Sequence, residues 1–259
     1  MSTATFTLNG ADPREAALRV LIVPHAGAGA ASGLAFAEHA PAGWLVATAR
    51  LPGRESRLRE SVPALPGLVD DVVATARALP GTAPLIVLGA CSGAVIALEA
   101  VRTLEREGGA TVAGLMVVSQ WAMTERPDPD RRSVSDTDDT AEILQILQEY
   151  GGADAVPRAL AGNPEMLALA LPPIVADVRA VEGHRCAPTP PLRCPLLTVF
   201  GDEDPLCPEE RVADWALFGE DIRTAWVPGG HMLLTQSPAL LVDALRGNLD
   251  QFGSAAEQR

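Results

Sequence analysis

Lysine is absent from this sequence: all 20 of its basic residues are arginine. The absence excludes a lysine Schiff base and the phosphate-binding lysine of a P-loop. The 33 acidic residues leave a formal net charge of −13. Because no basic tract interrupts this acidic chain, we expect no nucleic-acid partner.

Long apolar runs are also missing, since none reaches the roughly 18 residues of a membrane span. The first residues lack the basic and then apolar pattern of a secretory signal. We therefore expect a cytoplasmic protein with no membrane partner.

Cysteine is scarce, and no two cysteines form a CxxC pair. A cytosolic chain of this size needs no disulfides, and the histidines do not cluster with the thiols at metal-ligand spacing. We expect no metal. The four cysteines are Cys91, Cys186, Cys194 and Cys207.

What the chain does contain is a regular alternation of two patterns over its 259 residues. Apolar, β-rich runs that end in turn residues occupy residues 17–24, 44–51, 84–88, 112–118, 195–200 and, more briefly, 223–227. Helical patterns lie between several of them, at residues 67–78, 94–107, 209–217 and 237–252. This alternation predicts an α/β fold with a mostly parallel central sheet covered by helices on both faces.

Residues 124–191 break the alternation, because they carry no strand signal. A polar stretch at residues 125–139 precedes helical patterns at residues 139–150 and 164–182. We expect a core of residues 1–123 and 192–259, and a helical lid at residues 124–191 that covers the active site. The alternative is a helical excursion without a lid function.

Residues 89–93, Gly-Ala-Cys-Ser-Gly, connect a buried strand directly to a helix. They have the form of the nucleophile elbow G-x-S-x-G, with Cys91 at the nucleophile position. Side chains at Gly89 or Gly93 would collide with neighbouring backbone in so sharp a turn. The helix N-terminus favours a thiolate at Cys91. The alternative is a small buried cysteine in a tight turn.

A base and an acid follow in the chain order that this fold requires. His231 lies in a loop after the last strand and before the final helical region. A carboxylate at the end of the preceding strand could orient its imidazole and stabilise the imidazolium. Asp204 fits the spacing best, with Asp202 and Glu203 as rivals.

A glycine-rich loop follows the first strand, at residues 24–29. Such a loop can direct a backbone N–H at the reacting carbonyl, and the N–H of Ser92 would be the second donor of an oxyanion hole. His25 is interpreted as shaping this loop rather than as a catalytic group.

These segments together resemble the type II thioesterase family of polyketide and nonribosomal peptide assembly lines. The resemblance rests on PHAGAGAASG, ATARLPGRESRLRE, the elbow, GDEDP and GGH, and extends from about Leu21 to Phe252. It implies an α/β-hydrolase fold with a helical lid and no cofactor. It also implies substrates that arrive as thioesters on the phosphopantetheine of an acyl or peptidyl carrier protein.

Cysteine at residue 91 departs from the family, which normally has Gly-His-Ser-Met-Gly at the elbow. An acyl-cysteine stays more activated than an acyl-serine, particularly toward carbon nucleophiles. The chain therefore resembles the thioesterase-like Dieckmann cyclases, which release chains by carbon–carbon closure of tetramate or pyridone rings. In this hypothesis His231, oriented by Asp204, takes the proton of Cys91, the Cys91 thiolate attacks, and the N–H groups of Ala26 and Ser92 hold the oxyanion.

Two alternatives remain: a hydrolytic editing thioesterase that uses cysteine, and a non-catalytic relative that binds a ligand. For carrier docking the candidates are Arg54, Arg57 and Arg59, which could instead hold their own loop by internal pairs. For the acyl pocket the candidates are Leu167, Leu171 and Ile174 of the lid, which could equally be core.

Overall fold

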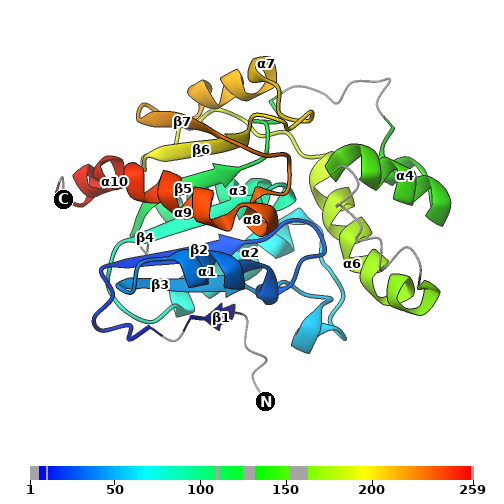
Figure 1. Ribbon diagram of the computed structural model, residues 1–259, viewed down its shortest axis with the longest axis horizontal. Coiled ribbons are helices and arrows are strands. Elements are labelled where there is room, and N and C mark those ends of the chain that lie inside the picture. Colours follow the sequence, from blue (N-terminus) through cyan, green and yellow to red (C-terminus); the bar gives the residue numbers. More distant parts are fainter. Residues whose placement is uncertain (1–5, 10, 109–110, 125–131, 152–162, 258–259) are drawn as a thin grey trace.

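A single mixed sheet forms the centre of the computed structural model, which describes residues 6–9, 11–108, 111–124, 132–151 and 163–257 (Figure 1). The strand order is β1-β3-β2-β4-β5-β6-β7, and every neighbouring pair is parallel except β1 with β3. The strands are β1 (Phe6–Leu8), β2 (Leu18–Val23), β3 (Trp44–Ala49), β4 (Leu85–Ala90), β5 (Val112–Val118), β6 (Leu196–Gly201) and β7 (Ile222–Val227).

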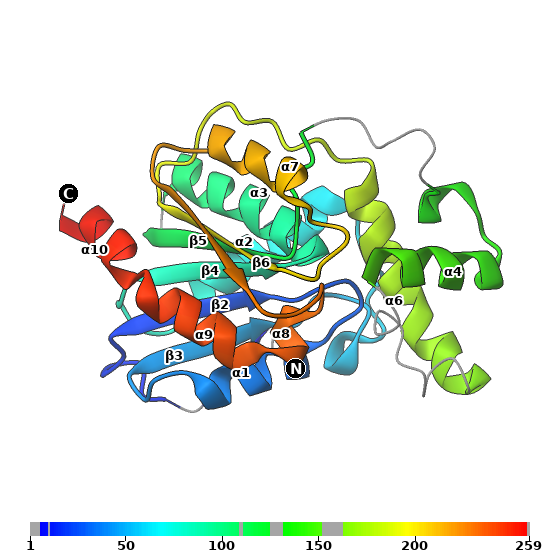
Figure 2. The same ribbon diagram turned by 45° about the horizontal axis from the view of Figure 1, so that its top comes forward.

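Helices cover both faces of this sheet (Figure 2). Alternate residues of β2 show why: Leu21 and Val23 belong to one buried cluster, whereas Val20 and Ile22 belong to another. The first cluster includes residues of α2 (Leu65–Ala78) and α3 (Ser92–Glu107), and the second includes residues of α1 (Leu34–His39) and α9 (Pro238–Gly247). Strands buried on both faces read as continuous apolar runs, so the expected α/β architecture is confirmed. The helices of the core are α1 (Leu34–His39), α2 (Leu65–Ala78), α3 (Ser92–Glu107), α7 (Glu209–Val212), α8 (Leu233–Gln236), α9 (Pro238–Gly247) and α10 (Leu249–Glu257).

The six parallel strands lie where the sequence predicts them, but some other elements differ. The expected helix at residues 237–252 is part of a series of three helices, α8, α9 and α10. Pro238 begins α9, because its ring suits a first helical turn, and Asn248 ends it. The pattern at residues 209–217 forms only the short α7 and a 3-10 helix, Ala213–Leu217. The edge strand β1 and helix α1 were not predicted.

The helical insertion forms a lobe beside the sheet, visible on the right of Figure 1. It consists of α4 (Thr140–Gly151) and α6 (Pro164–Glu182), close to the predicted helices. These helices pack on each other through Ile146, Leu171 and their neighbours. Much of the polar stretch at residues 125–139 lies outside the described residues, and the lid function of the lobe stays a prediction. Within the described part of the chain, no helix is long and apolar enough to cross a membrane.

Candidate active site

Cys91 occupies the turn between β4 and α3. Its backbone has φ 50° and ψ −127°, a strained conformation for a residue with a side chain. The turn is held because the Cys91 N–H donates to the Val118 carbonyl at 2.9 Å. A β-carbon on Gly93 would lie 2.3 Å from the Val23 carbonyl oxygen, and one on Gly89 would lie 2.5 Å from Cα of Ala94. The sequence 89–93 therefore folds into the sharp elbow that its glycines predict.

His231 and Asp204 meet beside this elbow. The Nδ1–H of His231 donates to Oδ2 of Asp204 at 2.8 Å, and both side chains are buried. Asp204 is held in turn by the Leu206 N–H, which donates to its Oδ1 at 2.9 Å. Asp202 instead accepts from the Gly229 N–H, and Glu203 is exposed. Of the three candidate acids, the structure brings Asp204 to the imidazole.

The electrostatics of the group favour charge on both Cys91 and His231. Burial acts to raise the pKa of the Cys91 thiol, but the positive His231 and the Ser92 N–H outweigh burial, so this pKa lies below its ordinary value. Burial acts to lower the pKa of His231, yet the Cys91 thiolate and Asp204 raise it above its ordinary value. The arrangement can therefore hold a thiolate–imidazolium pair before substrate binds.

Two backbone N–H groups border the elbow at the predicted oxyanion hole. In the loop after β2, the Gly27 N–H donates to Asp177 at 2.8 Å and the Ala28 N–H donates to the His25 carbonyl at 3.0 Å. The Ala26 N–H between them has no hydrogen-bond partner among the described residues. The Ser92 N–H lies in the open first turn of α3 and contacts the Cys91 sulfur. Two backbone N–H groups at these positions can stabilise an oxyanion.

His25 lies in the same loop, where its carbonyl accepts from the Ala28 N–H. Burial lowers the pKa of its imidazole to about 4, and the nearby positive His231 and Arg54 contribute. A neutral imidazole here adds no charge to the loop.

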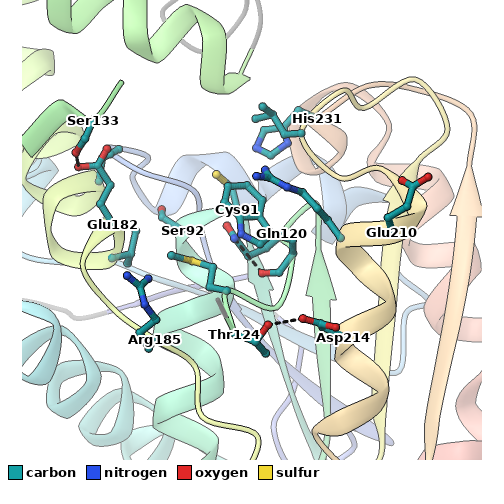
Figure 3. A pocket seen from close by; sticks show the side chains of 16 residues that line it. Cys91, Ser92, Gln120, Thr124, Ser133, Glu182, Arg185, Glu210, Asp214 and His231 are labelled. Carbon is teal, nitrogen blue, oxygen red and sulfur yellow. Dashed lines mark hydrogen bonds between the residues drawn. The ribbon is translucent and has the colours of Figure 1, made fainter. Parts of the chain in front are cut away.

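A cavity of about 290 Å³ opens beside Cys91 and His231, which both point toward it in Figure 3. The structure places none of the predicted acyl-pocket residues, Leu167, Leu171 and Ile174, in its wall; they pack inside the lobe near Ala26. The same helix, α6, supplies Val178, Val181 and Glu182 to the wall, and the role of the three leucine and isoleucine residues in an acyl pocket stays a prediction. The described residues that line the cavity are Cys91, Ser92, Gln120, Trp121, Met123, Thr124, Ser133, Val178, Val181, Glu182, Arg185, Leu206, Glu210, Arg211, Asp214 and His231.

Two of the three arginines expected to dock a carrier are buried in ion pairs. Arg54 forms a bidentate ion pair with Asp177, in which its Nη1 and Nη2 donate to Oδ2 and Oδ1 at 2.7 and 2.8 Å. Arg57 pairs with Glu60 and Asp71. These contacts favour the alternative, that the arginines hold the loop from within. Arg59 is exposed.

Sequence reasoning missed Cys207, which it interpreted as an uninvolved thiol. The thiol is buried against both Asp204 and His231, and burial raises its pKa to about 12. Its position three residues after Asp204, in the same turn, was the available signal. The ligand atoms of these three residues lie within 4.8 Å of one another, but Nδ1 of His231 is already bonded to Asp204.

A second group with metal-ligand atoms this close comprises Glu99, His184 and Cys186. Nε2 of His184 lies 3.1 Å from Glu99, which also pairs with Arg102 at 3.2 Å. A guanidinium competes directly with a cation for this carboxylate, so neither group is well suited to hold a metal.

A parallel sheet, an elbow with a strained nucleophile position and a following acid and histidine define the class of α/β-hydrolases. Within this class the chain belongs to the thioesterase domain family, which it matches over residues 18–247. It is therefore an enzyme of thioester chemistry. Members of the family need no cofactor, because the protein supplies its own nucleophile.

Among its relatives, the chain is 31% identical over 200 residues to Thioesterase PikA5 of Streptomyces venezuelae, covering 77% of this chain and 69% of PikA5. It is 31% identical to a probable cadicidin biosynthesis thioesterase of Streptomyces griseus, covering 90% of this chain and 63% of that protein. Among solved structures, RedJ, a thioesterase from the prodiginine biosynthetic pathway in Streptomyces coelicolor, superposes with a TM-score of 0.78 at 28% identity, covering 90% of this chain and 86% of RedJ.

Proposed function

We propose that this chain is a type II thioesterase relative of a polyketide or nonribosomal peptide assembly line that releases its product by Dieckmann cyclisation. Its substrate is an aminoacyl thioester on the phosphopantetheine of a carrier protein, with a 1,3-dicarbonyl group in the acyl chain. The observation that carries the proposal is a cysteine at the elbow, with a lowered pKa beside His231.

Cysteine suits acyl transfer to carbon better than it suits hydrolysis. Attack of a thiolate on a thioester exchanges one thioester for another, so loading the enzyme costs little free energy. The acyl-Cys91 that results keeps the activation of the thioester. An acyl-serine is an ordinary oxygen ester, which is less activated toward attack by the carbon nucleophile that closes the ring.

In the first half-reaction, the Cys91 thiolate attacks the thioester carbonyl. The N–H groups of Ala26 and Ser92 bind the oxyanion, and one such donor is typically worth about 10²–10³ in rate. The C–S bond to pantetheine then breaks, and the His231 imidazolium gives its proton to the departing thiolate. Acyl-Cys91 and a neutral His231 remain.

In the second half-reaction, neutral His231 takes a proton from the carbon between the two carbonyls. The electron pair of that C–H bond moves into the enolate, whose carbon attacks the acyl-Cys91 carbonyl. A C–C bond forms and the C–S bond breaks, which returns the Cys91 thiolate beside the His231 imidazolium. Because the resting ion pair is restored, no other acid or base is needed.

A hydrolytic editing enzyme is the second candidate function. It is favoured by the two Streptomyces relatives, both named thioesterases. In that case water replaces the enolate carbon as the nucleophile and the free acid is the product.

The deciding experiment is a product assay with an N-(3-oxoacyl)aminoacyl thioester of N-acetylcysteamine. We expect a tetramate, identified by its mass, which is one water below that of the free acid, and by its ultraviolet spectrum. Formation of only the free acid above the uncatalysed background would reject cyclisation.

Cys91→Ala is the variant that tests the nucleophile in the same assay. We expect turnover to fall to the background rate, because no thiolate remains to accept the acyl group. A Cys186→Ala variant is the matched control, since this buried thiol lies outside the cavity lining. Full activity of Cys91→Ala would refute the proposed site.

A further inference from the structure

The wall of the cavity beside Cys91 carries two guanidinium groups among both polar and apolar side chains. Arg185 follows α6, and Arg211 belongs to α7; both line the cavity and both are half-buried. Figure 3 shows the Arg185 side chain extending from the chain after α6 into the cavity. Their neighbours on the wall include Met123, Val178 and Val181.

Neither arginine forms an ion pair with a carboxylate of the described residues. The only hydrogen bond of Arg185 among the described residues is to the His184 carbonyl, at 3.5 Å. The Arg211 guanidinium stacks on Trp121, 5.0 Å from the ring centroid. Arg54 and Arg57, by contrast, are each held by carboxylates at 2.6–2.8 Å.

The carboxylates on the same wall are already engaged or face elsewhere. Glu182 accepts from the side chains of Ser133 and Ser135 and from the Val134 N–H. Asp214 accepts from the Thr124 hydroxyl. Glu210 is exposed and points away from Cys91 in Figure 3.

An unbonded polar group also lies behind this wall. The hydroxyl of Ser92 is buried and has no hydrogen-bond partner among the described residues, although Ser92 lines the cavity. Leaving a buried hydroxyl unbonded is unfavourable, as is facing a cation toward apolar side chains. The two guanidinium groups, which are half-buried on the cavity wall, gain acceptors when an oxygen-rich group enters the cavity.

We propose that Arg185 and Arg211 form a cationic subsite that binds the carbonyl oxygens of a 1,3-dicarbonyl group in the acyl chain. This inference rests on the proposed transfer of the chain to Cys91, and it names the residues that select the substrate. The subsite binds the enolate form more tightly than the neutral form, because the two guanidinium charges oppose the negative charge on the oxygens.

The tether between the two reacting centres supports this placement. In an N-(3-oxoacyl)aminoacyl chain, two atoms separate the thioester carbonyl from the first carbonyl of the dicarbonyl group. A chain bound to Cys91 therefore holds its dicarbonyl inside the same cavity of about 290 Å³. Arg185 and Arg211 lie on the wall of that same cavity.

The test compares two N-acetylcysteamine thioesters of equal length, the N-(3-oxoacyl)aminoacyl compound and its 3-deoxo analogue. The measured quantity is the single-turnover acylation of Cys91 at increasing substrate concentration, followed by quenched-flow mass spectrometry of the intact protein. Arg185→Gln and Arg211→Gln are compared with wild type. Arg246→Gln is the matched control, because Arg246 is an exposed residue of α9.

We expect wild type to prefer the 3-oxo compound by about tenfold in acylation efficiency, the value of one charge-assisted hydrogen bond. Each cavity variant should lose most of this preference and acylate the 3-deoxo compound at nearly the wild-type rate. Arg246→Gln should keep the preference. The unfolding midpoints of all variants show whether the fold is retained.

Equal acylation of both compounds by wild type would overturn the subsite, and so would equal losses on both compounds in the variants. Failure of the proposed function is seen separately in the product. Selective acylation followed by release of only free acid would retain the subsite and reject cyclisation. Tetramate formation without arginine-dependent selectivity would retain cyclisation and reject the subsite.

Discussion

At the scale of single residues, Cys91 differs from the other thiols of the chain in its surroundings. It lies at a helix N-terminus beside a buried histidine, and its pKa is lowered. The pKa values of Cys186, Cys194 and Cys207 are all raised, chiefly by burial. Of the four thiols, Cys91 alone therefore has a pKa below the ordinary value.

Alkylation by iodoacetamide should reveal this difference. A thiolate reacts and a thiol does not, so an ordinary cysteine loses reactivity below a pH of about 8.5. Because the pKa of Cys91 is lowered, its reactivity should persist below that pH and fall only when the pH passes through the lowered pKa.

Peptide mapping after brief alkylation between pH 5 and 9 measures each site, with the three buried cysteines as internal controls. They should remain unmodified in the folded protein. A Cys91 profile with its midpoint at or above the ordinary thiol value would contradict the ion pair.

Cys91→Ser tests whether sulfur itself matters. The serine hydroxyl cannot form the resting ion pair, and its ester is less activated toward carbon. We expect ring formation to fall by about 10²-fold or more, the scale of a lost activated nucleophile, with residual product shifted to free acid. The ratio of tetramate to acid, measured by liquid chromatography and mass spectrometry, decides the outcome; unchanged cyclisation would show the sulfur argument to be wrong.

At the scale of elements, one buried ion pair joins the helical lobe to the loop near the elbow. Asp177 of α6 binds Arg54 through both oxygens and also accepts the Gly27 N–H. Arg54 in turn donates to the Ala28 carbonyl at 3.2 Å. The position of α6 is therefore coupled to the loop that presents the Ala26 N–H.

A double-mutant cycle should measure this coupling. Arg54→Met or Asp177→Leu alone leaves one buried charge without its partner, which typically costs about 3–5 kcal/mol of stability. The double variant removes both charges and should be closer to wild type than the sum of the single effects predicts. Urea unfolding of the four proteins gives the free energies, and additive effects would argue against a coupled pair.

At the scale of the whole molecule, the formal net charge of −13 sets the long-range electrostatic interaction with a partner protein. Arg54 and Arg57, two of the arginines expected to attract an acidic carrier, are instead bound internally. Like charges repel as two acidic proteins approach, and added salt screens that repulsion.

Salt should therefore improve turnover of a substrate on an acidic carrier protein. We expect kcat/KM to rise by about threefold between 20 and 200 mM NaCl, as the screening length shortens. The N-acetylcysteamine thioester of the same chain is the control and should change little. A decrease with salt for the carrier-bound substrate would instead indicate docking through a local cationic patch, for which exposed Arg59 is the first candidate.

Much of the fold was predictable because its strands are buried on both faces. Six apolar runs marked the six parallel strands, whereas β1 has only three residues, too few to form a pattern. The single helix expected over residues 237–252 was wrong because Pro238 and Asn248 place helix boundaries around one continuous amphipathic pattern.

The elbow glycines and the order of the candidate catalytic residues are features of the sequence itself, so the sequence could predict them. Gly89, Gly93 and the order Cys91, Asp204, His231 follow from what a sharp turn and a parallel sheet require. The sequence by itself determined the fold class and the candidates for nucleophile, acid and base.

Tertiary structure alone decided which side chains share one space. Asp204 was separated from its rivals Asp202 and Glu203 only by the direction in which each side chain leaves the turn. Arg54 pairs with Asp177, which lies 123 residues further along the chain. The side chains of the cavity wall come from α6, α7 and the ends of several strands. The physical reason is that burial and charge pairing depend on packing between distant segments, which local patterns do not record.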